Sequence, residues 1–117
     1  MVALVATRDP ERARRFYGEA LGLRLVSDDP WALVFDAAGT RLRIQKVERL
    51  TPQPFTVLGW QVASIDAAVD GLAARGVKFE RYDGMDQDAR GVWTAPSGAR
   101  VAWFKDPDGN TLSVTQL

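Results

Sequence analysis

Residues 103–117 read WFKDPDGNTLSVTQL and predict a β-hairpin closed by a three-residue loop. Pro107 fixes φ at the start of the turn, and Gly109 supplies the positive φ that closes it. Asp106 can accept hydrogen bonds from the turn backbone, and Asn110 opens the returning strand. We therefore expect two antiparallel strands, 100–106 and 111–116, in a register set by this turn.

The register of this hairpin separates its side chains into two faces. Phe104 is expected opposite Leu112, and Trp103 opposite Ser113. Because side chains alternate along a strand, Phe104 and Leu112 share an apolar face with Val114, which is typical of a sheet packed under a helix. Trp103 and Ser113 share the other face with Thr115, which we expect to line a cavity.

Composition favours one domain spanning 1–117 and excludes several classes of partner. The chain has 117 residues, 46% of them hydrophobic, and a formal net charge of zero. This is enough to bury a core, and the mixed charges give no basic footprint for nucleic acid or for a membrane surface. No apolar run is long enough to span a membrane, and the start lacks the pattern of a signal peptide, so we expect a cytoplasmic protein.

Two residue types are missing altogether. The chain contains no cysteine and no histidine. It therefore offers no thiol nucleophile, no thiolate ligand and no imidazole, the commonest general base and metal ligand. We expect no catalytic residues of these kinds. Carboxylate acid–base chemistry is still possible through Glu48, Glu80 or Asp83, although their spacing indicates nothing specific.

Two helices are predicted, each between strand-like segments. In DPERARRFYGEALG, Asp9 caps the helix and Gly22 ends it; in SIDAAVDGLAARG, Ser64 caps and Gly76 ends it. Phe16 and Tyr17 fall on the apolar stripe of the first helix. Strands are expected at VALVAT, LRLVSD, WALVFD and RLRIQKV in the first half, and at TVLGWQVA, VKFERYD, RVAWFKD and TLSVTQ in the second.

Both halves therefore read as β-α-β-β-β, which predicts an α+β fold of two repeated modules. We place the first module at 1–47, a proline-containing linker at 48–55 and the second module at 56–117. The second module is longer by about fifteen residues, which belong to the turn-rich segment DGMDQDARGVWTAPS around Trp93.

The doubled pattern, with DPERARRFYGEALGLRL near its start and FKDPDGNTLSV at its end, resembles the glyoxalase/bleomycin-resistance/dioxygenase superfamily of vicinal oxygen chelate proteins. The resemblance covers essentially the whole chain. It implies two modules that form a curved mixed sheet, a half-barrel cup with the helices outside. It also implies a divalent metal in the cup of catalytic members.

The metal ligands of that family map onto four positions of this chain. The resemblance places the two histidines at Val2 and Val57, the last glutamate at Ser113 and its first-half counterpart at Arg43. Valine has no lone pair, serine is a poor ligand and arginine repels a cation. We therefore expect a cup without a metal and without a cofactor.

Strand parity predicts what the cup contains instead. A loop of Ala37, Ala38 and Gly39 would pair Leu33 with Arg43. Val2 and Leu4 would face inward from the first strand. The predicted cavity is aromatic and apolar with few polar groups, as small-molecule pockets generally are. Its expected ligand-binding residues are Trp31, Leu33, Arg43, Gln45, Val57, Gly59, Gln61, Trp93, Trp103, Ser113 and Thr115.

Several of these residues have a second interpretation. Trp60 falls on the helix-facing side and is expected in the core. Trp31 and Trp103 are equally compatible with a core or a dimer interface, and Trp93 with a lid or a surface anchor. Arg43 either binds a ligand or forms an internal ion pair with Glu48 or Asp36.

Two functions remain open at this point. The favoured hypothesis is a metal-free homodimer that sequesters a small aromatic molecule, as drug-resistance members of the resembled superfamily do. The alternative is a metal-independent lyase or isomerase of the same superfamily. The linker ERLTPQPF permits a cup built from two halves of one chain or from halves of two chains.

Overall fold

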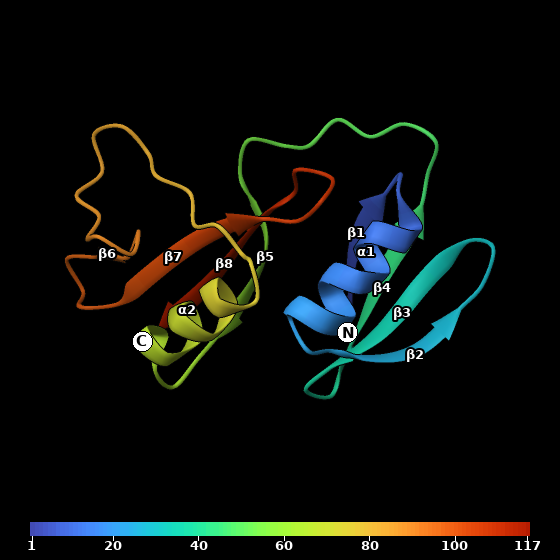
Figure 1. Cartoon of the computed structure of the whole chain (residues 1–117), viewed down its shortest axis with the longest axis horizontal. Helices are drawn as coiled ribbons and strands as arrows, with labels where there is room; N and C mark the ends of the chain where they lie inside the picture. The colour runs from blue at the N-terminus through green and yellow to red at the C-terminus, as the bar shows by residue number, and fades with distance from the viewer. The chain divides into compact units, whose positions relative to one another are not determined.

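Two four-stranded mixed sheets, each with a helical segment on one face, make up the computed structural model, which describes residues 1–117 (Figure 1). The residues cluster into two units. Unit 1 comprises residues 1–53 and 106–110, and unit 2 comprises residues 54–105 and 111–117. This is the α+β architecture of two β-α-β-β-β modules that the sequence predicts. No helix is both long enough and apolar enough to cross a membrane.

Unit 1 holds the first sheet, whose strand order is β1-β4-β3-β2. Strand β1 runs parallel to β4, and the other neighbouring strands are antiparallel. Its elements in chain order are β1 (Val2–Thr7), α1 (Pro10–Arg15), η1 (Phe16–Ala20), β2 (Arg24–Asp28), β3 (Ala32–Ala37) and β4 (Thr40–Lys46).

The first helix begins as predicted and then changes its hydrogen bonding. The Asp9 side chain accepts a hydrogen bond from the Arg12 N–H at 3.2 Å. In the π-helical turn η1, the Leu21 N–H donates to the Phe16 carbonyl at 3.0 Å. The wider turn brings the Tyr17 ring to 6.1 Å from the Phe35 ring, on the helix side of the sheet. Tyr17 is fully buried as a result.

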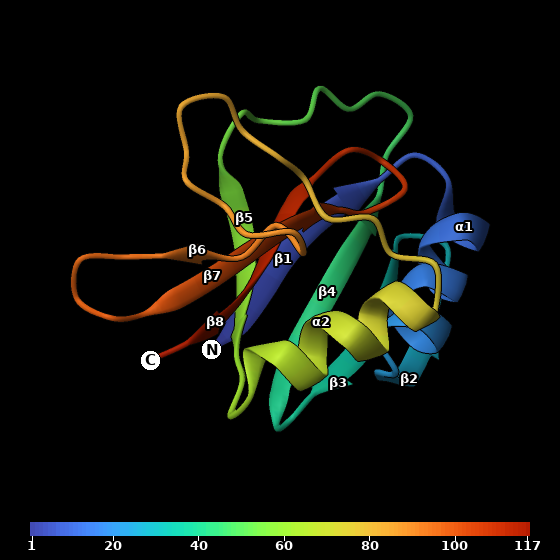
Figure 2. The same cartoon turned by 60° about the vertical axis from the view of Figure 1, so that its left-hand side comes forward.

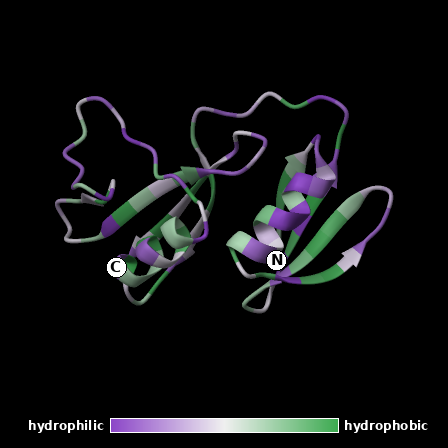
Figure 3. Ribbon diagram, viewed as in Figure 1, coloured by the Kyte–Doolittle hydropathy of each residue, from purple (hydrophilic) through white to green (hydrophobic).

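The core of unit 1 lies between its sheet and the helical segment. Leu33 and Ile44 are direct partners across β3 and β4, and Phe35 pairs with Leu42. All four side chains are buried. Figure 3 shows these strands largely in the green of hydrophobic residues.

The predicted pairing of β3 with β4 is wrong by one residue. Ala37 pairs with Thr40, so the loop has two residues, Ala38 and Gly39, with φ of 50° and 92°. Positive φ at both loop positions is the geometry that matches the twist of a two-residue hairpin. An alanine in a sequence does not predict a positive φ, because its Cβ disfavours that conformation. Arg43 consequently pairs with Val34.

Unit 2 repeats the topology with the strand order β5-β8-β7-β6. Helix α2 contacts β7 and β8 and covers one face of this sheet (Figures 1 and 2). The elements are β5 (Thr56–Gln61), α2 (Ile65–Ala74), β6 (Trp93–Thr94), β7 (Arg100–Lys105) and β8 (Thr111–Gln116).

The helix cap and the hairpin register of unit 2 are confirmed. Ser64 accepts a hydrogen bond from the Ala67 N–H at 3.2 Å. Phe104 pairs with Leu112 and Trp103 with Ser113, as the PDG loop predicts. The side that faces α2 is therefore apolar, with buried Ala102, Phe104, Leu112 and Val114. Trp60 pairs with Val114 and lies on this same side, as expected.

The predicted strand at 77–83 is wrong. Toward β7 this segment makes only an isolated bridge, Phe79 with Phe104, and a hydrogen bond from the Glu80 N–H to the Trp103 carbonyl. The fourth strand is instead β6, which lies in the additional segment. The residues between α2 and β6 form a loop, much of it purple in Figure 3.

The turn at 106–110 belongs to unit 1. The buried Asp106 carboxylate accepts hydrogen bonds from the Tyr17 hydroxyl at 2.7 Å and from the Asn110 side chain at 2.9 Å. The Asn110 amide also donates to the Ala6 carbonyl at 3.0 Å, and the Thr7 hydroxyl donates to Asp108. Burial raises the pKa of Asp106, while the bonds from Asn110 and Tyr17 oppose that rise. Burial, followed by the charge of Asp106, raises the pKa of Tyr17.

Candidate functional site

The candidate site is the open face of unit 2, which we define as the side of its sheet opposite α2. Cross-strand pairing assigns its residues, because partners in a ladder project to the same side. One row joins Gly59, Ser113 and Trp103. The next row joins Gln61, Thr115, Val101 and Trp93.

Three aromatic rings gather on this face. The Trp103 ring lies 6.2 Å from the Trp93 ring, with the two planes inclined by 38°. The Tyr82 ring meets Trp103 edge to face at 5.7 Å and 85°. We call Tyr82, Trp93 and Trp103 the aromatic cluster. Trp93 and Trp103 are half-buried and Tyr82 is 38% exposed, so ring surface remains open to solvent.

Polar contacts fix the central ring. The Trp103 Nε1–H donates a hydrogen bond to the Thr56 Oγ1 at 3.2 Å. Gly59 lies beside Ser113, and a Cβ added at Gly59 would come within 2.8 Å of the Ser113 Oγ. The glycine therefore gives the serine hydroxyl room to lie against the strand. The face combines a fixed indole with a few hydroxyl and amide groups.

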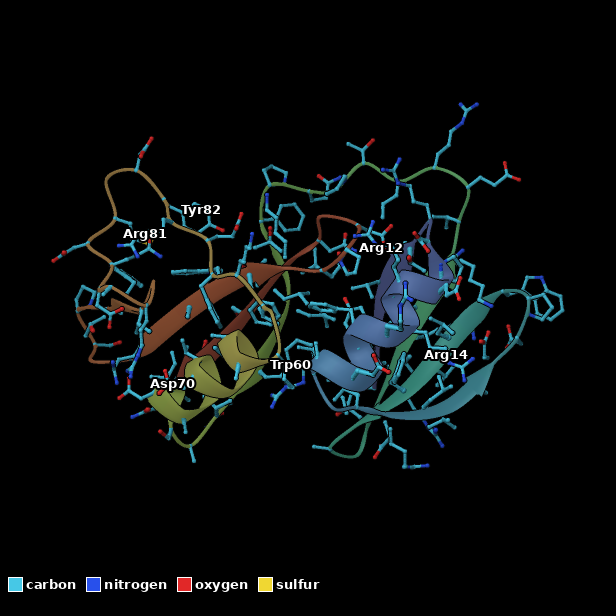
Figure 4. All side chains as sticks on the ribbon, viewed as in Figure 1. Arg12, Arg14, Trp60, Asp70, Arg81 and Tyr82 are labelled. Atoms are coloured by element: carbon cyan, nitrogen blue, oxygen red, sulfur yellow. The ribbon has the colours of Figure 1, made fainter.

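Gln87 organises the loop that supplies Tyr82. Its side-chain amide donates to the Glu80 carbonyl at 3.0 Å and to the Gly91 carbonyl at 2.8 Å. Its Oε1 accepts from the Tyr82 N–H at 2.8 Å. Figure 4 shows Tyr82 on this loop next to Arg81, whose guanidinium donates to the Gln87 and Asp88 carbonyls. Burial raises the pKa of Tyr82, with a further contribution from the charge of Glu80.

Ion pairs join the far part of the loop to α2. Arg90 contacts Asp66 at 3.0 Å and Asp70 at 3.1 Å, and Asp70 is labelled on α2 in Figure 4. Arg100 of β7 also contacts Asp66 at 3.2 Å. The hydrogen bond from Arg100, aided by the charge of Arg90, lowers the pKa of Asp66. These contacts hold the segment that carries Trp93.

Most of the predicted binding residues of unit 2 lie on the open face. Gly59, Gln61, Trp93, Trp103, Ser113 and Thr115 share it. Val57 does not follow the parity argument, because it lies in a bulge of β5 between Thr56 and Leu58. Tyr82 was missed, because 77–83 was predicted as a strand. Its position next to the turn-rich segment was the available signal.

The open face of unit 1, again the side opposite its helix, has another composition. Leu4, Arg43 and Val34 form one row, and Ala6, Gln45 and Ala32 form the next. Leu33 is not on this face; it is buried on the helix side, so its predicted role is withdrawn. Trp31 precedes β3 and is 70% exposed, so it is not a core residue.

Arg43 forms neither of the two ion pairs that the sequence left open. Asp36 lies near Arg24, with 3.8 Å between carboxylate and guanidinium, and Glu48 is exposed beyond β4. No carboxylate lies within 4.0 Å of the Arg43 guanidinium. Arg43 contributes to lowering the pKa of Asp29, but less than the hydrogen bonds from the Trp31 and Ala32 N–H groups do.

Four residues of this chain occupy the positions to which the metal ligands of the superfamily map, and their side chains are not suited to bind a metal ion. Val2 and Val57 offer no donor atom, and Arg43 carries a positive charge. Ser113 has one neutral hydroxyl, which lies against Gly59. The structure contains no group of three or more histidine, cysteine, aspartate or glutamate side chains that could hold a metal ion.

A groove in unit 1 lies outside the open face of that unit. It has a volume of about 480 Å³ and lies on the helix side of the sheet. Its lining consists of Glu11, Arg14, Arg15, Gly18, Glu19, Leu23, Leu25 and Phe35. The lining holds two acidic and two basic side chains, and Arg14 is paired with Asp28 at 3.1 Å. This balanced lining indicates no particular ligand, so the groove is not the candidate site.

Comparison with known proteins agrees with the topology. The family model for the glyoxalase/bleomycin resistance protein/dioxygenase superfamily matches residues 2–114. The chain belongs to this superfamily. No curated protein sequence matches it.

Solved structures give the same fold. A member of this superfamily from Sphaerobacter thermophilus DSM 20745 is 27% identical, with a TM-score of 0.77 over 99% of this chain and 94% of that chain. The lactoylglutathione lyase from Agrobacterium tumefaciens is 16% identical, with a TM-score of 0.77 over 99% and 91%. The fosfomycin resistance protein FosX from Listeria monocytogenes is 15% identical, with a TM-score of 0.76 over 100% and 91%. At these lower identities the likeness concerns the fold alone.

Proposed function

We propose that the protein binds and sequesters a small, flat aromatic molecule on the open face of unit 2. The observation that carries this proposal is the aromatic cluster, in which Trp103 is fixed by Thr56 and flanked by Trp93 and Tyr82. A rigid indole with exposed ring surface and neighbouring hydroxyl groups matches the lining of small-molecule sites. No nucleophile–base pair accompanies it, which favours binding over turnover.

The energies support useful affinity. Each aromatic contact contributes about 0.5–1.5 kcal/mol beyond the burial of apolar area. A ligand that stacks on Trp103 and touches Trp93 or Tyr82 gains this contribution more than once. The loop is held by Gln87 before any ligand arrives, so little ordering is required on binding.

Tryptophan quenching with a panel of aromatic compounds tests the proposal. We expect saturable quenching by at least one compound, and Trp103→Ala should weaken its binding by about tenfold. The matched control is Trp31→Ala, since Trp31 is exposed and lies outside the aromatic cluster. If the Trp103→Ala variant and the parent bind every quenching compound with equal affinity, the ligand site does not lie on this face.

We further propose that binding needs no divalent metal. The support is the donor chemistry of Val2, Arg43, Val57 and Ser113, none of which suits a cation. Elemental analysis of purified protein should find no stoichiometric metal, and EDTA should leave the melting temperature unchanged. A stoichiometric ion, or a clear drop in stability on chelation, would contradict this.

We also propose that the protein acts as a homodimer in the cytoplasm. Each sheet has two outer strands, and the outer strand β1 carries Leu4 with 63% exposure. Outer strands with exposed apolar residues favour pairing between copies. Light scattering at micromolar concentration should give about twice the 12.9 kDa mass of one chain. A mass near that of one chain would contradict the proposal.

A further inference from the structure

The geometry points to a second site, on unit 1, where Arg43 binds an oxyanion such as a carboxylate or phosphate group. The proposal is independent of the aromatic site on unit 2. It starts from a guanidinium in the middle of a sheet face rather than at its rim. Arg43 lies on the inner strand β4, between Leu4 of β1 and Val34 of β3.

Arg43 has no carboxylate within 4.0 Å, and Asp29 interacts with its charge only at longer range. The two residues directly beside it in the ladder are aliphatic, and its side chain is half-buried. A guanidinium has five N–H donors and no acceptor, so a half-buried one is stabilised by a group that accepts several of them. No side chain of the protein forms an ion pair with Arg43.

The nearby carboxylates already have other partners. Asp28 pairs with Leu33 and therefore lies on the helix side, where Lys46 binds it at 2.6 Å and Arg14 at 3.1 Å. Asp29 accepts hydrogen bonds from two backbone N–H groups at 2.8 and 2.9 Å. Asp36 accepts one from the Gly39 N–H at 3.2 Å and lies near Arg24. Arg43 is therefore left to an external anion.

The chemistry favours a planar or tetrahedral oxyanion. Arginine presents two parallel N–H donors that match a carboxylate or phosphate in a bidentate arrangement. The aliphatic side chains of Leu4 and Val34 flank Arg43 and offer no acceptor that would compete with the anion. Gln45, two residues further on the same strand and face, offers an amide donor to the same group.

The test uses inorganic phosphate, benzoate and the neutral benzamide at constant ionic strength. The readout is the Nε–Hε resonance of Arg43 and the backbone amides of Leu4 and Val34 in ¹H–¹⁵N spectra. We expect saturable shifts with phosphate or benzoate and none with benzamide at these three positions. The anion that binds more tightly identifies the ligand class, and shifts of the tryptophan indole signals report the aromatic cluster separately.

Variants distinguish a specific anion site at Arg43 from nonspecific attraction of anions to positive charge. Arg43→Gln should weaken anion binding by about tenfold, followed at the Leu4 and Val34 amides. Arg43→Lys keeps the charge but loses the two parallel N–H donors of the guanidinium, so it should bind the anion more weakly than the parent. Arg41→Gln is the matched control, since Arg41 lies on the same strand and face beside Asp36. The proposal is overturned if the Arg43 resonance does not shift with anion concentration or shifts linearly without saturating. It is also overturned if Arg41→Gln weakens anion binding as much as Arg43→Gln does.

Discussion

The two units share one topology but present different open faces. In unit 1 that face carries Arg43 between aliphatic neighbours. In unit 2 it carries the aromatic cluster over a row of small and polar residues, including Gly59 and Ser113. A repeated fold thus fixes the helix-facing core and leaves the open face free to acquire different chemistry.

The difference comes largely from the additional segment of unit 2. Trp93 lies within this segment and Tyr82 lies next to it, and Gln87 ties them into one loop. Unit 1 connects its helix directly to β2 and has no counterpart. Trp103 belongs to the repeated part, whereas Trp93 lies in β6 of the additional segment and Tyr82 directly precedes that segment. The insertion therefore creates the candidate site.

Replacing Phe104 and Trp103 separately tests whether the two sides of β7 have different roles. Phe104→Ala should lower the free energy of unfolding by about 3–5 kcal/mol, because Phe104 is fully buried. Trp103→Ala should cost clearly less stability, since its ring is half-buried, while ligand affinity falls. Urea unfolding and quenching titrations measure both. A larger stability loss for Trp103→Ala would reverse the assignment of faces.

Tyr17→Phe tests the buried network in unit 1 that has no equivalent among the hydrogen bonds of unit 2. We expect a loss of about 1–3 kcal/mol at neutral pH, because Asp106 loses a charge-stabilising donor. Burial raises the pKa of Asp106 above its ordinary value of 3.8. Such a carboxyl contributes stability that is complete below its unfolded pKa and is lost as the pH rises through its folded pKa.

Without the Tyr17 hydroxyl the folded pKa of Asp106 rises further, so the destabilisation should be larger at pH 7 than at about pH 3. Chemical denaturation at both pH values measures this. Tyr82→Phe is the matched control, since the Tyr82 hydroxyl forms no hydrogen bond within the protein. Its change in the free energy of unfolding should be the same at both pH values. Identical losses for Tyr17→Phe at the two pH values would show that Asp106 does not sense the hydroxyl.

Gln87→Ala should remove what distinguishes unit 2 while sparing its sheet. Three hydrogen bonds of the loop are lost, at partly exposed positions, so we expect a modest destabilisation of about 1 kcal/mol. The near-ultraviolet circular dichroism of the aromatic cluster should weaken, because the Tyr82 N–H loses its Gln87 partner and the Tyr82 ring is less firmly held against Trp103. Gln53→Ala, in the exposed linker, is the control. An unchanged aromatic signal would mean that another contact orders the loop.

Ala38→Gly addresses the two-residue hairpin of unit 1 and should have the smallest effect. Alanine at φ 50° is strained, and glycine adopts this conformation without a Cβ clash. The gain is partly offset by the greater freedom of glycine in the unfolded chain, which leaves a net stabilisation of about 0.5–1 kcal/mol. Thermal unfolding measures it. A lower melting temperature would show that Ala38 is not strained.

The sequence predicted the parts of the fold that depend on strong local signals. Gly109 and Pro107 determined the β7–β8 register, and Asp9 and Ser64 determined both helix starts. Where the local signal was absent, the prediction failed. Ala38 takes a conformation that is typical of glycine or asparagine. The two-residue loop was therefore not predicted, and the predicted register placed Leu33 on the wrong face.

The candidate site was predictable only in part for the same reason. Strand parity correctly grouped Trp103 with Ser113, because one turn fixes their register. The segment 77–83 has the composition of a strand, but the contacts of Gln87 and Arg81 hold it as a loop. These are tertiary contacts between residues whose types carry no pattern. Tyr82 could therefore be assigned to the candidate site only from the structure.

The indole N–H signals of the four tryptophans test the central claim most directly. Each signal is assigned by the single replacement of Trp31, Trp60, Trp93 or Trp103 in ¹H–¹⁵N spectra. On saturation with an aromatic compound that quenches fluorescence, we expect large shifts for Trp103 and Trp93 and none for Trp31. Unchanged Trp103 and Trp93 signals at saturation would contradict the assignment of the aromatic cluster as the ligand site.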